Sequence, residues 1–353
     1  MSAGCHTCDG AAPRLDGSIA TPAGSIPRVF TTWVRADHLG AWRMRWNLGR
    51  MAYSVPPGLY AVGTPSADSP VFVTANYKLS FDHLRRALDG LDGWVLVLNT
   101  HGINVWCAAG KGTFGTDELV ARLAAVRLAE VVRHRRLILP QLGAVGVAAH
   151  EVRRQSGFDV VYGPVRAADI PAFMAASCRA TPEMRRVHFG LADRLAVAPV
   201  EIAMGAPLVL GLALLVALTG GLGVGTWSLH ELPRRGLQGA ALLVTSFLGA
   251  TLLVPALLPW LPGRAFALKG AAVGLALCLC AALCGGLPRL GCGPWLAALP
   301  WLLMLPALTA FVGLSFTGAS TYTSLSGVRR EMRLAMPAIL VAGAAGLTLW
   351  MAL

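Results

Sequence analysis

One cysteine stands in a setting that suits soft-metal chemistry. Cys107 lies within the segment NVWCAAGKGTFGT, Asn104–Thr116, beside a tryptophan, two alanines and three glycines. A thiolate is a soft, strongly donating metal ligand, and small neighbours let a large flat ligand approach the backbone closely. The segment is not a phosphate-binding loop, because the Walker pattern needs a glycine where Val105 stands. A buried, inert thiol is the alternative interpretation of a lone cysteine.

The other cysteines are weaker candidates. Cys278, Cys280 and Cys284 fall within one apolar run and could hold a soft metal ion, although small polarisable packing residues explain them as well. Cys5 and Cys8 form a CxxC pair that suits a soft metal ion, but a single pair is a weak indication of a metal site. The spacing of the cysteines predicts no disulfide framework.

The elements around Cys107 alternate between strands and helices. The apolar runs 71–75 and 94–98 predict buried strands, with a helix over 81–88 between them, and 103–106 is either a short strand or the entry to a helix. Further expected elements are a helix over 117–134 capped by Thr116, strands over 137–139 and 158–162, and helices over 145–154 and 170–177. This alternation predicts a Rossmann-like layered sheet, in which ligands bind at the carboxyl ends of strands.

The chain divides into a charged part and a nearly uncharged part. Before Val197 it has 22 basic and 15 acidic residues, and from there onward only 8 and 3. Charged residues make up 14% of the whole chain, against about 25% in ordinary soluble proteins. The formal charge of +12 therefore indicates loops attracted to anionic lipid rather than a nucleic-acid partner.

Five apolar runs are long enough to cross a bilayer, which takes about 20 residues each. They cover 197–219, 237–258, 265–286, 294–316 and 334–353. Glu201 and Pro207 interrupt the first run, and Glu201 is either a functional intramembrane carboxylate or a residue at the interface. The predicted division is a flexible leader over 1–35, an α/β domain over 36–195 and a membrane domain over 196–353.

The orientation of these spans follows from the charges of the loops. The N-terminus lacks the basic start and apolar run of a secretory signal, so the first domain is expected in the cytoplasm. With that orientation, eight basic residues fall inside and three outside, in agreement with the positive-inside rule. The sequence thus predicts a multi-pass protein of the cytoplasmic membrane with its α/β domain in the cytoplasm.

Six blocks of the chain, in this order, carry a resemblance to one family. They are VTANYKLSFD (Val73–Asp82), NVWCAAGK (Asn104–Lys111), GVAAHEVRRQSGF (Gly146–Phe158), YGPVRAADIPAF (Tyr162–Phe173), ATPEMR (Ala180–Arg185) and FTGASTYTSLSGVRREM (Phe316–Met332). The chain resembles the HgcA family, the membrane-bound corrinoid proteins of microbial mercury methylation, which are related to the corrinoid iron-sulfur proteins. The resemblance extends from about Ala36 to the last span.

This resemblance implies a cobalamin held base-off in the α/β domain, with Cys107 as the lower axial ligand of its cobalt. The other cofactor-binding residues that it implies are Thr74, Asn104, Val105, Trp106, Ala108, Ala109, Gly110 and Lys111. Trp106 could instead be a core residue, and Lys111 a solvated charge. His150 is a rival axial ligand because imidazole also binds cobalt, but it ranks below Cys107 since the motif centres on the cysteine.

The function that the resemblance implies is methyl transfer from methylcobalamin to mercury(II), which forms methylmercury. A donating thiolate on cobalt favours transfer of the methyl group to an electrophile such as mercury(II). The resemblance also implies a ferredoxin-like partner with two [4Fe-4S] clusters and a methyl donor of the folate type. Two alternatives are a corrinoid methyl carrier for another acceptor, and a membrane transporter with a regulatory α/β domain that binds no corrin.

Overall fold

The computed structural model describes residues 12–221, 230, 232–288, 293–319 and 325–353. Contacts within the chain separate two compact units, and each is described by itself. Unit 1 comprises Met1–Met44 and Leu48–Val187, and unit 2 comprises Arg45–Asn47 and His188–Leu353. Unit 1 contains a mixed β-sheet with helices, and unit 2 is helical.

The sheet of unit 1 has seven strands in the order β1-β2-β3-β5-β4-β6-β7. Their bounds are β1 Leu15–Thr21, β2 Gly24–Val29, β3 Gly58–Val62, β4 Val71–Ala75, β5 Gly93–Leu98, β6 Arg136–Leu139 and β7 Asp159–Tyr162. Strands β5, β4, β6 and β7 run parallel to one another, whereas β3 is antiparallel to β5. The parallel strands are buried apolar runs in β4 and β5, as expected where helices cover both faces of a sheet.

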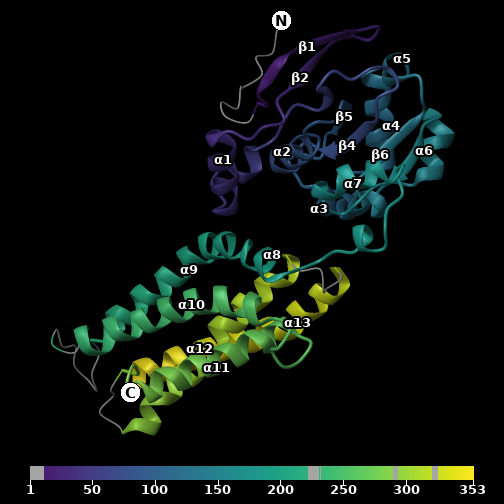
Figure 1. Cartoon of the computed structure of the whole chain (residues 1–353). Coiled ribbons are helices and arrows are strands. Elements are labelled where there is room, and N and C mark those ends of the chain that lie inside the picture. The colour runs from purple at the N-terminus through teal and green to yellow at the C-terminus, as the bar shows by residue number, and fades with distance from the viewer. Residues whose placement is uncertain (1–11, 222–229, 231, 289–292, 320–324) are drawn as a thin grey trace, which may run out of the picture. The chain divides into compact units, whose positions relative to one another are not determined.

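Helices cover both faces of these parallel strands (Figure 1). On one face, α2 (Lys78–Ala87) and α7 (Ile170–Ala175) pack on Phe72 and its neighbours. On the other face, α3 (Val105–Lys111), α4 (Thr116–Ala125) and α6 (Ala149–Ser156) pack on Val71 and Val73. Because successive side chains of a strand point to opposite faces, one apolar run such as β4 supplies both cores.

The chain reverses direction across the sheet at β4. From β4 it passes through α2 to β5, the neighbour of β4 on one side within the sheet. It then passes through α3, α4 and α5 (Leu128–Val131) to β6, the neighbour of β4 on the other side. The helix that follows β4, α2, and the helix that follows β6, α6, lie on opposite faces of the sheet. In sheets of this kind a crevice opens at the carboxyl ends of the two strands, where ligands bind.

The sequence-based predictions of the elements are confirmed in most of the α/β unit. All four predicted strands are present, and 103–106 enters helix α3. The helix predicted over 117–134 is wrong, because Arg127 adopts a left-handed φ of 47° that separates α4 from α5. Thr116 is also not its cap: Gly115 holds that position, and the Thr116 hydroxyl accepts a hydrogen bond from the Ala148 amide.

Two other regions differ from the prediction. Within the first 35 residues, for which the sequence predicts no regular structure, β1 and β2 form an antiparallel hairpin. Strand β3 and helix α1 (Arg35–Arg45) are further elements that were not predicted. The hairpin is largely exposed, so its strands lack the apolar runs that identify buried strands.

Within the residues that the structure describes, unit 2 contains five helices that are long and apolar enough to cross a membrane. They are α9 (Ala198–Thr219), α10 (Gln238–Leu257), α11 (Phe266–Leu283), α12 (Pro294–Ser315) and α13 (Leu325–Ala352), preceded by the short α8 (Leu191–Leu195). Gly274 brings α11 and α12 together, because a Cβ there would lie 2.7 Å from the Pro306 Cα. A mixed α/β domain followed by five apolar helices, as predicted, is thus confirmed.

Candidate functional site

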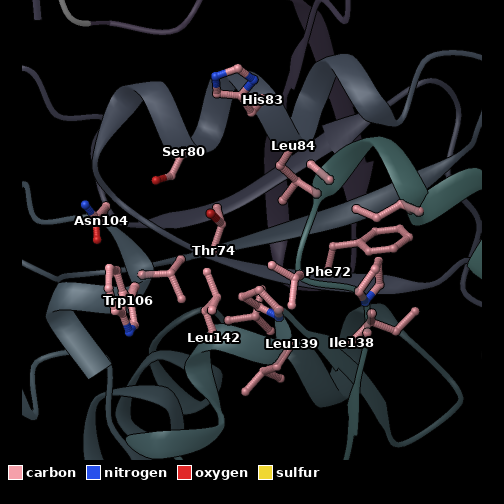
Figure 2. A pocket seen from close by; sticks show the side chains of 18 residues that line it. Phe72, Thr74, Ser80, His83, Leu84, Asn104, Trp106, Ile138, Leu139 and Leu142 are labelled. Carbon is pink, nitrogen blue, oxygen red and sulfur yellow. The ribbon is translucent and has the colours of Figure 1, made fainter. Parts of the chain in front are cut away.

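A pocket of about 400 Å³ lies at the carboxyl ends of β4 and β6 (Figure 2). Strand β4 contributes Phe72, Val73 and Thr74, helix α2 contributes Ser80, His83 and Leu84, and the start of α3 contributes Asn104, Val105 and Trp106. The remaining wall comes from β6 and the turns after β6 and β7, with residues 138–140, Leu142, 163–165, Ala167 and Ile170. The pocket therefore occupies the crevice that the strand order predicts.

The pocket is mainly apolar, with a few polar groups in defined places. Thr74 is 3% exposed, and in Figure 2 it lies near the middle of the lining residues. Within the described part of the chain, neither the Thr74 hydroxyl nor the Ser80 hydroxyl has a hydrogen-bond partner. Apolar walls with a small number of free polar groups are typical of sites for organic ligands.

Helix α3, which carries Cys107, is short but capped at both ends. The Asn104 side chain accepts a hydrogen bond of 2.9 Å from the Cys107 amide, which is an N-cap. Gly112 ends the helix with φ of 83°, a conformation that favours glycine, and its amide donates to the Ala109 carbonyl. The glycine-rich sequence after Cys107 thus defines the end of the helix.

The small residues of α3 allow it to pack closely on the turn Gln141–Val145 that follows β6. Ala108 and Ala109 are buried on this side of the helix. A Cβ on Gly146 would lie 3.0 Å from the Ala109 Cα, so a larger residue at either position would push the helix away. The alanines and glycines of the cysteine segment therefore fit a close helix–turn contact.

The turn before α3 is held by one buried side chain. Asn76 directly follows β4, and its Oδ1 accepts hydrogen bonds from the amides of Thr100 and Gly102 at 3.1 and 2.9 Å. The Thr100 hydroxyl lies 2.8 Å from the same oxygen. This contact links the ends of β4 and β5 and stabilises a turn in which His101 has φ of 56°. Asn76 was not predicted, although a polar residue directly after a buried strand is a usable signal.

The structure brings together only some of the residues predicted to bind the cofactor. Thr74, Asn104, Val105 and Trp106 line one pocket. Ala108 and Ala109 lie on the buried side of α3, in the core. The residues Cys107, Gly110 and Lys111 are exposed and do not line the pocket.

The position of Cys107 narrows its possible roles. Its side chain is exposed, so the alternative of a buried, inert thiol is wrong. It directly follows Val105 and Trp106, which line the pocket, and the thiol therefore belongs to the helix that borders the pocket. The rival ligand His150 is exposed in the first turn of α6, not in the middle of a helix, and it does not line the pocket.

The other predicted metal-binding groups are not assembled into a site within the described residues. Cys278 is buried, whereas Cys280 and Cys284 are exposed, so the three thiols do not converge. Among described residues there is no group of three or more His, Cys, Asp or Glu side chains that could hold a metal ion. Cys5 and Cys8 lie outside the described residues. Glu201 lies in the first turn of α9, where a carboxylate complements the helix dipole.

Four buried charges hold α2, the helix that supplies Ser80 and His83. The Lys78 ammonium contacts Asp82 at 2.6 Å and Asp37 at 3.1 Å, and Arg85 contacts the same carboxylates at 2.7 and 2.9 Å. Burial raises the pKa of Asp37, but hydrogen bonds from the Val34 amide and Arg85 outweigh it and hold that pKa below its ordinary value. Burial lowers the pKa of Lys78, but the Asp82 carboxylate outweighs burial and raises it.

Sequence reasoning missed most of the pocket wall outside β4 and α3. Ser80 and His83 lie three residues apart on α2, which places them on one side of that helix. Pro140 and Pro164 follow β6 and β7, so the carboxyl ends of the predicted strands were the signal that could have found them. The distances between these segments along the chain explain why periodicity does not reveal the pocket.

The pocket lies within a stretch that is similar to known proteins. Residues 46–174 match the family described as CO dehydrogenase/acetyl-CoA synthase delta subunit. A gamma subunit of the acetyl-CoA decarbonylase/synthase complex from Archaeoglobus fulgidus is 32% identical over 127 residues, or 35% of this chain and 27% of that protein. The corrinoid/iron-sulfur protein large subunit from Moorella thermoacetica is 30% identical over 121 residues, or 34% of this chain and 27% of that protein.

A gamma subunit from Methanopyrus kandleri gives a similar result, 30% identity over 127 residues, with 35% of this chain and 27% of that protein covered. The chain thus spans about a quarter of the length of the curated relatives that it matches. Every residue that lines the pocket falls within 46–174. The stretch that forms the pocket is therefore homologous to subunits of the acetyl-CoA decarbonylase/synthase complex and to a corrinoid/iron-sulfur protein.

Proposed function

We propose that this protein binds a corrinoid in its α/β unit and transfers a methyl group from it to mercury(II). One combination of observations supports the proposal: the pocket at the β4/β6 crevice is bordered by the helix with the exposed Cys107, within a stretch homologous to a corrinoid/iron-sulfur protein. The homology by itself suggests a corrinoid methyl carrier, and the acceptor mercury(II) is the more specific part of the proposal.

The residues at the pocket fit part of such a cofactor. A cavity of about 400 Å³ is at the small end of organic-ligand sites, so it suits the displaced nucleotide tail of a base-off cobalamin better than the whole molecule. The free hydroxyls of Thr74 and Ser80 are available to polar groups of that tail. The exposed thiol of Cys107 is accessible to a cobalt ion held outside the pocket.

Each residue then has a distinct task. Cys107 would be the lower axial ligand of cobalt, and Asn104 would hold the first turn of α3 that positions its thiol. Trp106, which is 37% exposed at the pocket, would shield bound ligand from water. The bound corrinoid supplies a transferable methyl group, and thiolate donation to its cobalt favours transfer to an electrophile such as mercury(II).

The proposal includes the partners and the location that the resemblance implies. A ferredoxin-like protein with two [4Fe-4S] clusters would restore the reduced cobalt, and a folate-type donor would supply the methyl group. The five apolar helices would anchor the protein in the cytoplasmic membrane with the α/β unit on the cytoplasmic side. Several relatives are subunits of a multi-protein complex, which supports the expectation of partner proteins.

A second candidate function is a corrinoid methyl carrier for another acceptor. The relatives favour it, because those from Archaeoglobus fulgidus and Methanopyrus kandleri are named as subunits of an acetyl-CoA decarbonylase/synthase complex. Both candidates share the pocket and Cys107 and differ only in the acceptor. A membrane transporter with a regulatory α/β domain has no such observation in its favour.

The test uses the full-length protein, purified from a host supplied with cobalamin. We expect a corrinoid absorption spectrum and, with methyl donor, reductant and thiol-bound mercury(II), formation of methylmercury. Cys107→Ala should remain folded but lose at least about 100-fold in rate, because loss of an axial ligand removes several kcal/mol of stabilisation. Cys178→Ala, a thiol of the same unit that does not line the pocket, is the matched control and should keep full activity.

The possible outcomes separate the candidates. A cobalamin-loaded protein that forms no methylmercury would favour the carrier for another acceptor. A protein without any corrinoid absorption would reject both corrinoid candidates together. Full activity of Cys107→Ala would reject the axial thiolate, even if the corrinoid is bound.

A further inference from the structure

Helices α11, α12 and α13 enclose a groove of about 930 Å³ in unit 2. These three helices lie side by side in Figure 1. Eight of the 18 residues that line the groove are alanines, among them Ala267, Ala307 and Ala338. Because alanine side chains are short, the facing helices leave a channel between them that larger apolar residues would fill.

One end of this groove is strongly basic. Arg264 and Arg330 line the groove, and Arg329 and Arg333 line an adjoining hollow of about 440 Å³ that shares Arg330. Within the described residues, none of these four guanidinium groups forms an ion pair or a hydrogen bond with another side chain. We call these four residues the arginine cluster.

The acidic residue at this end is already engaged. The Glu331 carboxylate accepts a hydrogen bond of 2.7 Å from the Ala267 amide, near the start of α11. It therefore satisfies a backbone donor and complements the positive end of that helix. Four guanidinium groups against one carboxylate leave an excess of three positive charges at the mouth of the groove.

The length of the groove indicates the kind of occupant. Along α13 it runs from Gly327 to Ala342, which is 15 residues or about 22 Å at 1.5 Å per residue. One leaflet of a bilayer, with its head groups, takes up about half of a total thickness of about 40–45 Å, which matches the length of the groove. A transmembrane helix of a partner would need the full thickness of the hydrocarbon core, about 30 Å.

We propose that this groove binds one anionic phospholipid, with its phosphate on Arg264 and Arg330 and its acyl chains along the alanine-rich walls. Guanidinium groups bind phosphate through paired, charge-assisted hydrogen bonds, which are shorter and stronger than neutral ones. Basic pockets between membrane helices are a known way to recognise lipid head groups. The site is independent of the corrinoid pocket, because all of its residues belong to unit 2.

The test measures lipid binding by the full-length protein in detergent, with phosphatidylglycerol and phosphatidylcholine as probes, by native mass spectrometry. We expect one phosphatidylglycerol to be retained in preference to phosphatidylcholine. Arg264→Gln and Arg330→Gln should each lower that affinity about fivefold and the double variant about 25-fold, since each basic residue contributes about 1 kcal/mol. Arg234→Gln, an exposed arginine that lines neither hollow, is the charge-matched control and should have no effect.

Two further measurements separate a lipid site from a simple anion site. Ala338→Trp should fill the groove and lower phosphatidylglycerol retention at least about tenfold, although it leaves every arginine in place. Millimolar inorganic phosphate should not displace the lipid. Displacement by phosphate, unchanged binding in Ala338→Trp, or equal retention of both lipids by the wild-type protein would each overturn the proposal.

Discussion

Two groups of charged side chains in this protein are arranged in opposite ways. Beneath α2, Asp37, Lys78, Asp82 and Arg85 are almost fully buried, and every charge contacts two of opposite sign. In the arginine cluster of unit 2, four exposed guanidinium groups have no acidic partner among the described side chains. The charges of the first group cancel, and the second group has an excess of positive charge.

The difference separates charges that stabilise the fold from charges that are available to a ligand. Burying an ion costs several kcal/mol, and only well-placed partners offset that cost, so each member of the buried group depends on the others. An exposed arginine stays hydrated and depends on no neighbour. We therefore expect substitutions in the buried group to affect folding, and substitutions in the arginine cluster to affect binding.

The largest effect is expected for Asp82→Asn, which leaves Lys78 and Arg85 buried with one carboxylate between them. Removing one partner of a buried pair costs about 3–5 kcal/mol. Hydrogen exchange of the full-length protein should show this loss as faster exchange in peptides from α2. Asp159→Asn, which breaks an exposed pair with Arg153, should cost less than about 1 kcal/mol. Similar costs for the two variants would contradict the comparison.

The second effect is a loss of stability in acid. Because the pKa of Asp37 is lower in the folded than in the unfolded protein, its contribution is complete above the unfolded value of about 3.9 and is lost as the pH falls through the folded value. The pKa of Lys78 is raised, so its contribution is lost only in strong alkali, above about 10.4. The protection of α2 amides from hydrogen exchange, relative to their intrinsic exchange rate at each pH, should therefore fall below about pH 4, and less so in Asp37→Asn. Protection of α2 from exchange that does not change with pH would contradict this assignment of Asp37.

A smaller effect is expected for Asn104→Ala, which removes a neutral cap rather than a charge. Loss of an N-cap costs about 1 kcal/mol, and it should loosen the first turn of α3 without affecting α2. Exchange of the Cys107 amide should rise, and cobalamin should bind more weakly if α3 positions it. Asn104→Asp is the control, because aspartate also caps helices and should restore the protection. If the aspartate variant behaves like the alanine variant, capping is not the role of Asn104.

The smallest effect on folding is expected for Arg330→Gln. In phosphatidylcholine, its melting temperature should equal that of the wild type within about 1 °C, because an exposed, unpaired arginine contributes less than about 0.5 kcal/mol. In phosphatidylglycerol the variant should lose the stabilisation that a bound lipid gives to the wild type. A marked loss of stability in phosphatidylcholine would place Arg330 with the buried charges instead.

The sequence was sufficient to predict those elements whose pattern of side chains lies within one short segment. Strands β4 and β5 are uninterrupted apolar runs, and five helices are long and apolar enough to cross a membrane. The last span is instructive, because α13 begins at Leu325 rather than near 334. Hydropathy marks only the part of a helix that lies in lipid, whereas arginines are good helix formers and extend the helix beyond it. Arg329 and Arg330 therefore belong to a helix and not to a loop.

The candidate site could be predicted only in part, because only some of its residues belong to one local segment of the chain. The composition of the cysteine segment identified α3, with Asn104 at its start and Gly112 at its end. The walls from α2 and from the turns after β6 and β7 come from distant parts of the chain, and no spacing in the sequence links them. The break at Arg127 was missed because an arginine is not expected at a positive φ.

By itself, the sequence determined the division into a charged and a nearly uncharged part. It also determined the parallel strands, the five apolar spans and an unusual cysteine between small residues. Each of these follows from side-chain chemistry over a few neighbouring positions. Only the tertiary structure decided that Cys107 is exposed beside a pocket that Thr74 lines, that four charges neutralise one another under α2, and that an alanine-lined groove ends in arginines. These features depend on the order of the strands and the packing of helices, which bring together residues that the chain separates.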